Sequence, residues 1–159
     1  MNEIETIDEF EQMLQRINID EVYIKQLFDI YHSRLLNDAT ACNKLARRGI
    51  SHEAIIQYHL GYCDRSLNRY IKTSSTAEGA SFRHVLKCAG LITANGHEVF
   101  RGCIVEPIYN EGTLLAVCGI KLICPSRPAP RIIQWFNGAM YPKPLAFHLM
   151  KWGARYVTH

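Results

Sequence analysis

The sequence predicts an α+β fold in which N-terminal helices and a helical hairpin pack on a small, mostly antiparallel sheet. Up to about residue 90, apolar residues recur at helical spacing behind residues that cap helices. From Leu91 onward, short apolar runs are separated by turn sequences such as Asn95-Gly96. A chain of 159 residues that is 48% hydrophobic can fill the core of one domain with a small appended helical piece.

Two amphipathic helices are expected at the N-terminus. Thr6 and Glu9 form a capping box ahead of a helix near residues 7–17. Asp20 can cap a second helix, which has the apolar spacing of one buried face. Neither helix suggests a chemistry, so we interpret residues 1–38 as an acidic helical N-terminal extension and residues 39–159 as the domain that follows. The apolar stripe of the second helix consists of Ile24, Leu27, Phe28, Tyr31 and Leu35.

A tight helical hairpin follows. Asp38 can cap a helix that Gly49 ends by accepting a left-handed conformation. Ser51 can cap the next helix, with Ile50 and Ile55 placed as a hydrophobic staple. The spacing therefore predicts two short antiparallel helices joined by a turn.

The polar stretch from Asp64 to Gly79 predicts a long loop of the kind often found over a functional surface. Serine, threonine and arginine are frequent in it. Residues 80–89 then resemble a helix that turns Phe82 and Leu86 inward and stops at Gly90.

The second half of the chain predicts antiparallel strands. Asn95-Gly96 predicts one hairpin, and an Asn110-Glu111-Gly112 turn joins a strand over 104–109 to one over 113–124. Proline residues then punctuate a loop before a final strand over 131–136 and a closing helix near 144–156.

Charge is distributed unevenly along the chain. Residues 1–38 hold nine acids and three bases, whereas residues 39–159 hold six acids and fifteen bases. No Asp or Glu follows Glu111, although six cations and several aromatic residues do. A polyphosphate with exposed bases would satisfy both features of this tail. Phosphoryl transfer with paired metals needs clustered carboxylates, which the tail lacks.

The cysteines do not have the spacing of a zinc motif. No pair forms C-x-x-C, and the nearest two, Cys118 and Cys124, have five residues between them. We therefore expect reduced thiols, although a zinc site from these two cysteines and a distant histidine stays open. None of the seven histidines lies in a known nucleophile context, which argues against a hydrolase triad.

The N-terminus has no signal-peptide pattern, and no run approaches the roughly 20 apolar residues of a membrane span. These two observations favour a cytoplasmic protein without membrane contact.

Four blocks, in one order, resemble the RNA polymerase domain of bacterial DnaG-type DNA primases. The resemblance covers roughly residues 39–150. The first block holds Ala41, Leu45, Arg48-Gly49-Ile50-Ser51, Glu53, Ile55 and Leu60-Gly61-Tyr62. The others are Gly90-Leu91 with Phe100-Arg101 and Ile104-Val105-Glu106-Pro107-Ile108, then Gly112 to Lys121, then Gln134-Trp135-Phe136-Asn137-Gly138 with Lys143.

The resemblance implies the N-terminal lobe of the primase catalytic core, an α+β subdomain whose basic groove guides single-stranded template. In that family a zinc ribbon precedes the core and a toprim subdomain follows it with the metal-binding carboxylates. The chain ends about where the toprim subdomain would begin, and it has no Cys/His ribbon before residue 39. We therefore expect no cofactor in this chain, with Mg²⁺ bound by a missing toprim subdomain, and no primer synthesis by the chain alone.

The expected partners are single-stranded DNA and a toprim-bearing or other replication protein. Family matches and charge together give six candidate nucleic-acid-binding residues and no catalytic or metal-binding residue. Arg101 is expected on a strand, where it could contact phosphate. Trp135 could stack a base, although an aromatic residue on a strand is more often part of the core. The candidates are Arg101, Lys121, Arg131, Trp135, Asn137 and Lys143.

Three departures from the family pattern support an alternative. Cys103 replaces an arginine, Glu106 an aromatic residue and Gln134 a basic residue, which suits a degenerate lobe that docks a replication protein through its acidic helices. A third hypothesis is a helix-turn-helix protein that places residues 52–59 in a major groove, where His52, Gln57 and Tyr58 could read bases.

Overall fold

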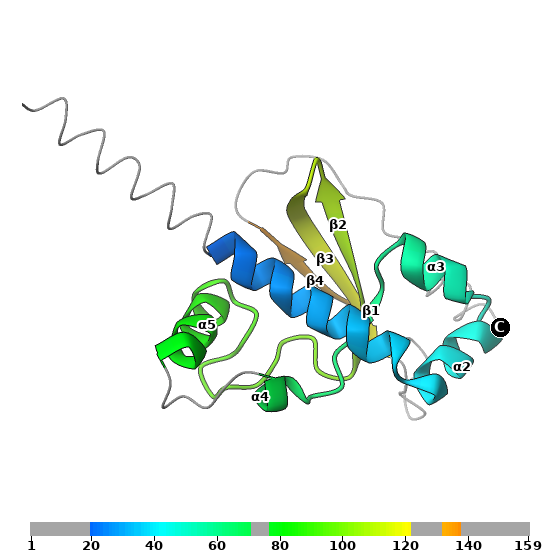
Figure 1. The fold of residues 1–159 in the computed structure, drawn as a ribbon, viewed down its shortest axis with the longest axis horizontal. Coiled ribbons are helices and arrows are strands. Elements are labelled where there is room, and N and C mark those ends of the chain that lie inside the picture. The colour runs from blue at the N-terminus through cyan, green and yellow to red at the C-terminus, as the bar shows by residue number, and fades with distance from the viewer. Residues whose placement is uncertain (1–19, 71–76, 122–131, 138–159) are drawn as a thin grey trace, which may run out of the picture.

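The computed structural model describes residues 20–70, 77–121 and 132–137, and within them five helices pack with an antiparallel four-stranded sheet (Figure 1). The predicted α+β fold is confirmed. The helices span residues 20–36, Ala39–Arg47 (α2), His52–Gln57 (α3), Leu67–Tyr70 (α4) and Ala77–Cys88 (α5). The strands, in sheet order, are Gly61–Tyr62 (β1), Cys103–Asn110 (β2), Thr113–Lys121 (β3) and Ile132–Phe136 (β4). The helices predicted at 7–17 and 144–156 lie outside the described residues.

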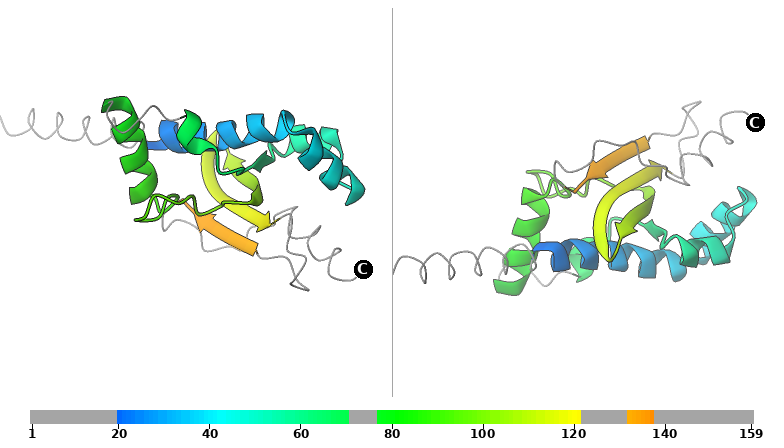
Figure 2. Two further views of the ribbon diagram at one scale, coloured as in Figure 1. Left: turned by 90° about the horizontal axis from the view of Figure 1, so that it is seen from below. Right: turned by 90° about the horizontal axis from the view of Figure 1, so that it is seen from above.

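The 20–36 helix runs along one side of the curved sheet (Figure 2). All five residues of its predicted apolar stripe are buried, which confirms the periodicity argument. Asp20 is already helical, so the start of this helix lies outside the described residues. The predicted domain boundary at residue 38 falls between this helix and α2, yet the helix packs in the same cores as the residues that follow.

The helical hairpin forms as predicted. Asp38 Oδ1 accepts a hydrogen bond from the backbone N–H of Ala41 at 3.0 Å, and Ser51 caps α3 in the same way. Gly49 has a φ of +85° after α2, which is the left-handed conformation that ends a helix. Both members of the predicted staple, Ile50 and Ile55, are buried.

Strands β2 and β3 form the centre of the sheet. The turn between them places Glu111 at φ +51° and Gly112 at φ +80°, a pair of positive φ values that matches the twist of the flanking strands. A register shift between Ile108 and Tyr109 interrupts an otherwise regular antiparallel ladder. The final strand, β4, pairs with β3 over its whole length.

Three local expectations differ from the structure. The Asn95-Gly96 turn is present, but the hairpin around it contains a single bridge, between Ile92 and Glu98. The chain turns again at residues 99–102 to enter β2, so longer strands cannot form there. Within the predicted 64–79 loop, the short helix α4 buries Leu67, and α5 begins at residue 77.

The sheet separates two hydrophobic clusters. On one face, Val105 and Val117 pack with α5 and most of the 20–36 helix. On the other face, Ile104 and Ala116 pack with α2 and α3. Leu35, near the end of the 20–36 helix, belongs to the second cluster, so this helix contributes to both cores.

Two polar contacts tie the 20–36 helix to distant segments. The buried Tyr31 hydroxyl donates to Glu98 Oε1 at 2.7 Å. His32 Nδ1 donates to the Leu60 carbonyl oxygen at 2.7 Å, and its ring stacks on that of His59 at 4.0 Å. Burial lowers the pKa of His32, which favours the neutral imidazole that can make this stack.

The helix also passes very close to β1. A Cβ atom at Gly61 would lie 2.7 Å from Tyr31 Cβ and 2.8 Å from the Tyr31 carbonyl carbon. The obstructing atoms are helix backbone atoms and a Cβ that is bonded directly to the backbone, so they cannot move aside at low cost. Only glycine at position 61 permits this approach.

We expect Gly61→Ala to lower the free energy of unfolding by about 1–3 kcal/mol, because the added methyl group overpacks a helix–strand contact. Chemical denaturation measures the free energy of unfolding. Gly112→Asn is the control, since Gly112 has open space around it and asparagine tolerates a positive φ. Equal stability of Gly61→Ala and the wild type would contradict the close packing.

A second prediction concerns the pH dependence of stability. Burial raises the pKa of Glu98, an effect that outweighs the hydrogen bonds from Tyr31 and Cys63, which lower it. The folded state therefore binds this proton more readily than the unfolded state. The Glu98 contribution to stability falls as pH rises from about 4.3 through the raised folded pKa, and is constant above it.

Glu98→Gln removes this titration. We expect the unfolding free energy of Glu98→Gln, relative to the wild type, to increase as pH rises across that window, as measured by urea denaturation at several pH values. Tyr31→Phe serves as the matched variant, because it keeps the carboxyl group and removes its hydroxyl donor. Parallel stability curves for Glu98→Gln and the wild type would show that Glu98 does not titrate differently on folding.

Candidate nucleic-acid interface

The turn before β2 is anchored by two buried side chains. Phe100 is 1% exposed, and its ring lies against Gly119 of β3, where a Cβ would be 2.5 Å from Phe100 Cδ1. The Glu98 carboxyl group accepts the hydrogen bond from the Tyr31 hydroxyl. Between these anchors and β2, Arg101 is exposed in the turn rather than on the strand predicted for it. Its guanidinium donates to the Glu98 carbonyl oxygen at 3.4 Å.

The segment that follows β1 lies beside this turn. The Gly102 N–H donates to the Cys63 carbonyl oxygen at 2.8 Å, and the Cys63 N–H donates to the Cys103 carbonyl oxygen at 3.0 Å. Cys63 is fully buried, and burial raises the pKa of its thiol. The start of the predicted 64–79 loop is therefore fixed to the start of β2.

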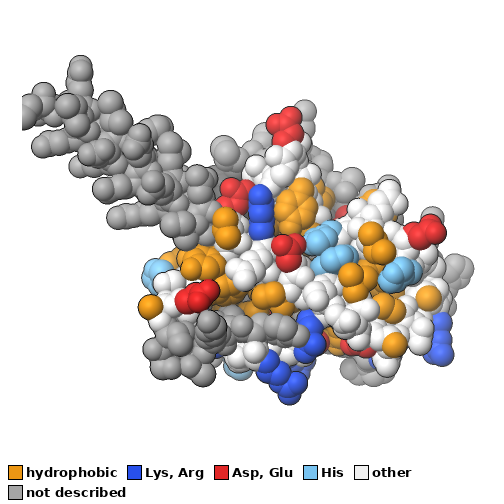
Figure 3. All heavy atoms as spheres, viewed as in Figure 1, with side chains coloured by type: hydrophobic (Ala, Val, Ile, Leu, Met, Phe, Trp, Pro, Cys, Tyr) orange, Lys and Arg blue, Asp and Glu red, His pale blue; other side chains and the backbone are white. Residues whose placement is uncertain are grey.

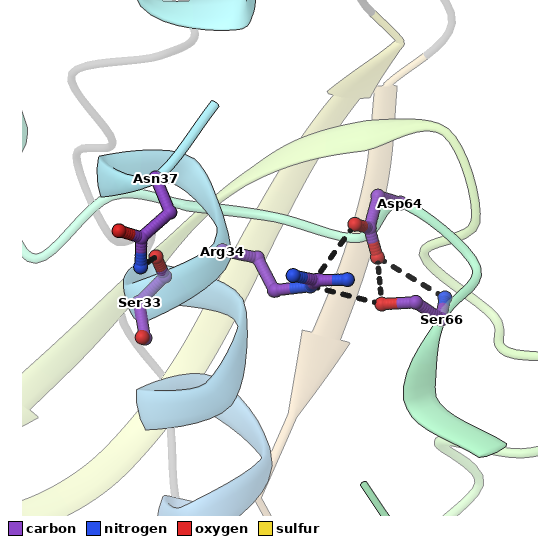
Figure 4. Close-up of polar contacts among 5 residues, drawn as sticks. All are labelled: Ser33, Arg34, Asn37, Asp64 and Ser66. Carbon is purple, nitrogen blue, oxygen red and sulfur yellow. Dashed lines mark hydrogen bonds and ion pairs between the residues drawn. The ribbon is translucent and has the colours of Figure 1, made fainter. Parts of the chain in front are cut away.

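A polar cluster holds the next residues of this segment (Figure 4). Arg34 reaches from the 20–36 helix and places Nε 3.1 Å from Asp64 Oδ2 and 3.0 Å from Ser66 Oγ. Asp64 Oδ1 accepts hydrogen bonds from the N–H of Ser66, at 3.1 Å, and from its hydroxyl group. Residues on either side of Arg65 are thus tied to each other and to the helix.

Arg65 and Lys121 extend this region on both sides of Arg101. Arg65 is exposed, and its Nη2 lies 3.7 Å from the position that a Cβ at Gly102 would occupy. Lys121 ends β3 and pairs in register with Cys103, two residues after Arg101. Adjacent strands lie about 5 Å apart, so the three cations share one end of the sheet. We call Arg65, Arg101 and Lys121 the basic edge.

The basic edge carries little compensating charge. Among the described residues, Lys25, Arg34 and His59 lie within 3.8 Å of a carboxylate, and none of these contacts includes a member of the basic edge. In Figure 3, Lys and Arg side chains gather at the lower edge of the face shown, near the position of α4 in Figure 1. Such a surface attracts anions from solution.

Two other predicted residues lie farther from Lys121: Trp135 pairs with Val117 in the middle of β3, and Asn137 lies at the opposite end of the sheet. Trp135 Nε1 donates to the Ala89 carbonyl oxygen at 2.7 Å, and the indole packs against the first cluster. Asn137 donates its side-chain amide to the Leu114 carbonyl oxygen at 2.8 Å. Leu114 lies seven residues from Lys121 along β3, about 23 Å at the rise of a strand. These contacts give both residues a structural role, and their role in binding stays a prediction.

The remaining candidates, Arg131 and Lys143, lie outside the described residues. The structure therefore brings together Arg101 and Lys121, and it places Trp135 in the middle of the sheet and Asn137 at the opposite end. It adds Arg65, which the sequence did not single out. The sequence feature that could have indicated Arg65 was its position in a polar loop of the kind that covers functional surfaces. Its charge did not distinguish it from the other basic residues of that loop.

Two of the three departures from the primase pattern are buried. Cys103 is fully buried, and Glu106 is 3% exposed, whereas Gln134 is exposed. Glu106, Cys118 and Gln134 lie side by side on β2, β3 and β4. The substitutions at residues 103 and 106 therefore change the interior, and only Gln134 changes a surface that template could meet.

The thiols and carboxylates of the described region do not form a chemical centre. Its five cysteines are all free, and burial followed by the charge of Glu106 raises the pKa of Cys118 to about 12. A thiol with such a pKa stays protonated and unreactive at neutral pH. No group of three or more His, Cys, Asp or Glu residues in this region could hold a metal ion.

In the part of the chain that the structure describes, no helix is both long and apolar enough to cross a bilayer.

Comparisons with known proteins identify the fold. No family model matches the chain, and no curated protein matches it. Among solved structures, a DnaG primase catalytic domain bound to ssDNA is similar, with a TM-score of 0.60 and 21% identity. That match covers 80% of this chain and 42% of the primase chain.

Two further structures agree with this one. The DnaG catalytic core gives a TM-score of 0.58 at 21% identity, over 77% of this chain and 39% of that one. The Aquifex aeolicus primase, with zinc-binding and RNA polymerase domains, gives 0.62 at 18% identity, over 78% and 30%. The chain thus has a primase-like fold and spans less than half the length of the structures that it matches.

Proposed function

We propose that this chain is a primase-related lobe that binds single-stranded DNA and does not synthesise primers by itself. The observation that carries the proposal is its fold, which is similar to a primase catalytic domain bound to ssDNA. The basic edge supports it, because three cations from three segments meet at one end of the sheet. Such a surface binds phosphates regardless of sequence.

On this proposal, the metal-dependent joining of nucleotides is carried out by residues of another protein. Joining nucleotides needs Mg²⁺ on clustered carboxylates, and the described residues offer no such cluster. By the primase resemblance, these carboxylates would come from a toprim-bearing partner or another replication protein. The chain would then contribute template binding and orientation, working with that partner in the cytoplasm.

We expect the purified chain to bind labelled single-stranded DNA with a micromolar Kd at low salt. Affinity should fall steeply as salt is added, because bound phosphates release counterions. Fluorescence anisotropy measures this dependence, with a duplex of the same sequence as competitor. Absence of binding at low salt would refute the proposal, and preference for one specific duplex would favour the helix-turn-helix hypothesis.

The double variant Arg101→Ala/Lys121→Ala tests the basic edge. The slope of log K against log salt should become less steep by about 0.7 for each phosphate that the variant no longer neutralises. Lys44→Ala/Arg47→Ala is the matched control, since it removes the same charge from the last turn of α2. Equal weakening of binding in both double variants would mean that net charge alone drives binding.

Primer synthesis tests the assignment of the metal site. With template, ribonucleotides and Mg²⁺, we expect no primer from the chain alone, measured by incorporation of labelled nucleotide. An intact bacterial primase is the positive control. Template-dependent product from this chain would overturn the assignment and show that it holds its own catalytic carboxylates.

A further inference from the structure

Arg65 has a backbone conformation that is unusual for its residue type. Its φ is +67°, in the left-handed region that favours glycine. A non-glycine residue persists there when its surroundings hold it, and such residues concentrate at functional sites. The role of Arg65 can therefore be inferred from the contacts that hold its backbone and from the groups near its side chain.

Contacts on both sides hold the Arg65 backbone. Before it, Cys63 exchanges backbone hydrogen bonds with Gly102 and Cys103. After it, Ser66 is bound to Asp64 and to Arg34 of the 20–36 helix (Figure 4). Asp64 is the acid nearest in sequence to Arg65, and its carboxylate forms an ion pair with Arg34.

The Arg65 side chain lies over the backbone beside Arg101. Its Nη2 is 3.7 Å from the Cβ position at Gly102, the residue that follows Arg101. Arg101 uses its guanidinium only for a long contact of 3.4 Å to a backbone carbonyl among the described residues. Two guanidinium groups from adjacent segments present planar sets of donors, the arrangement that binds phosphate oxygens.

We propose that Arg65 and Arg101 form a paired site for the phosphate backbone of single-stranded DNA, and that Arg34, Asp64 and Ser66 position Arg65. This inference rests on the proposed function and extends it to a residue that the primase resemblance does not include. The site contacts phosphates and not bases, so its contribution is independent of sequence.

Arg65→Ala should weaken binding to an oligothymidylate of about 20 nucleotides roughly threefold to tenfold, and reduce the salt slope by about 0.7. Fluorescence anisotropy with the full chain measures both. Arg47→Ala is the control of equal charge. With an otherwise identical methylphosphonate oligonucleotide, which lacks the backbone charge, the difference between Arg65→Ala and wild type should disappear.

The positioning role of Arg34, Asp64 and Ser66 can be tested because it predicts a change in affinity opposite to the one that net charge predicts. Asp64→Ala removes an acid, so charge alone predicts tighter binding, whereas displacement of Arg65 predicts weaker binding. Ser66→Ala leaves net charge unchanged and should also weaken binding. In the Arg65→Ala background, Ser66→Ala should have no effect, and Asp64→Ala should show only the tighter binding expected from the loss of its charge. Thermal unfolding of each variant confirms that it is folded.

Two results separate the inference from the proposed function. If the wild type binds no single-stranded DNA, the proposed function fails and the inference fails with it. If the wild type binds and Arg65→Ala binds equally well, or is weakened no more than Arg47→Ala, only the inference is overturned. Tighter binding by Asp64→Ala would overturn the positioning role.

Discussion

The close approach of the 20–36 helix to β1 at Gly61 is the contact on which the rest of the structure depends. It lets one helix fill a hydrophobic cluster on one face of the sheet with Leu27 and Phe28, and reach the other cluster with Leu35. Hydrophobic burial supplies most of the free energy of folding, so a helix shared by two cores couples them. A side chain at residue 61 would push this helix away from both.

The same helix organises the surface. Tyr31 fixes Glu98 and thereby the turn that carries Arg101, and Arg34 fixes the segment that carries Arg65. Both arginines are therefore positioned by residues spaced three apart on one helix, although they come from segments far apart in sequence. Binding through such a surface would be coupled to the packing of the helix, because moving the helix would displace both cations.

The sequence predicted more of the fold than of the site. Caps at Asp38 and Ser51 and the Glu111-Gly112 turn depend on nearby residues, so they could be read directly. Site residues depend on which segments meet. Charge and family resemblance selected Arg101 and Lys121, which the structure brings together, but they also selected Trp135, whose indole donor is bound to the Ala89 carbonyl.

What the sequence determined by itself was local: the apolar stripe of the 20–36 helix, the helical hairpin and the β2–β3 turn. Each follows from spacing or backbone preference within a few residues. Only the tertiary structure decided that Glu106 lies inside and that Arg65 lies beside Arg101. The reason is that the positions of Glu106 and Arg65 depend on strand pairing and on the crossing of the 20–36 helix over β1, where Tyr31 meets Gly61, 30 residues away in sequence. No local sequence pattern encodes such contacts.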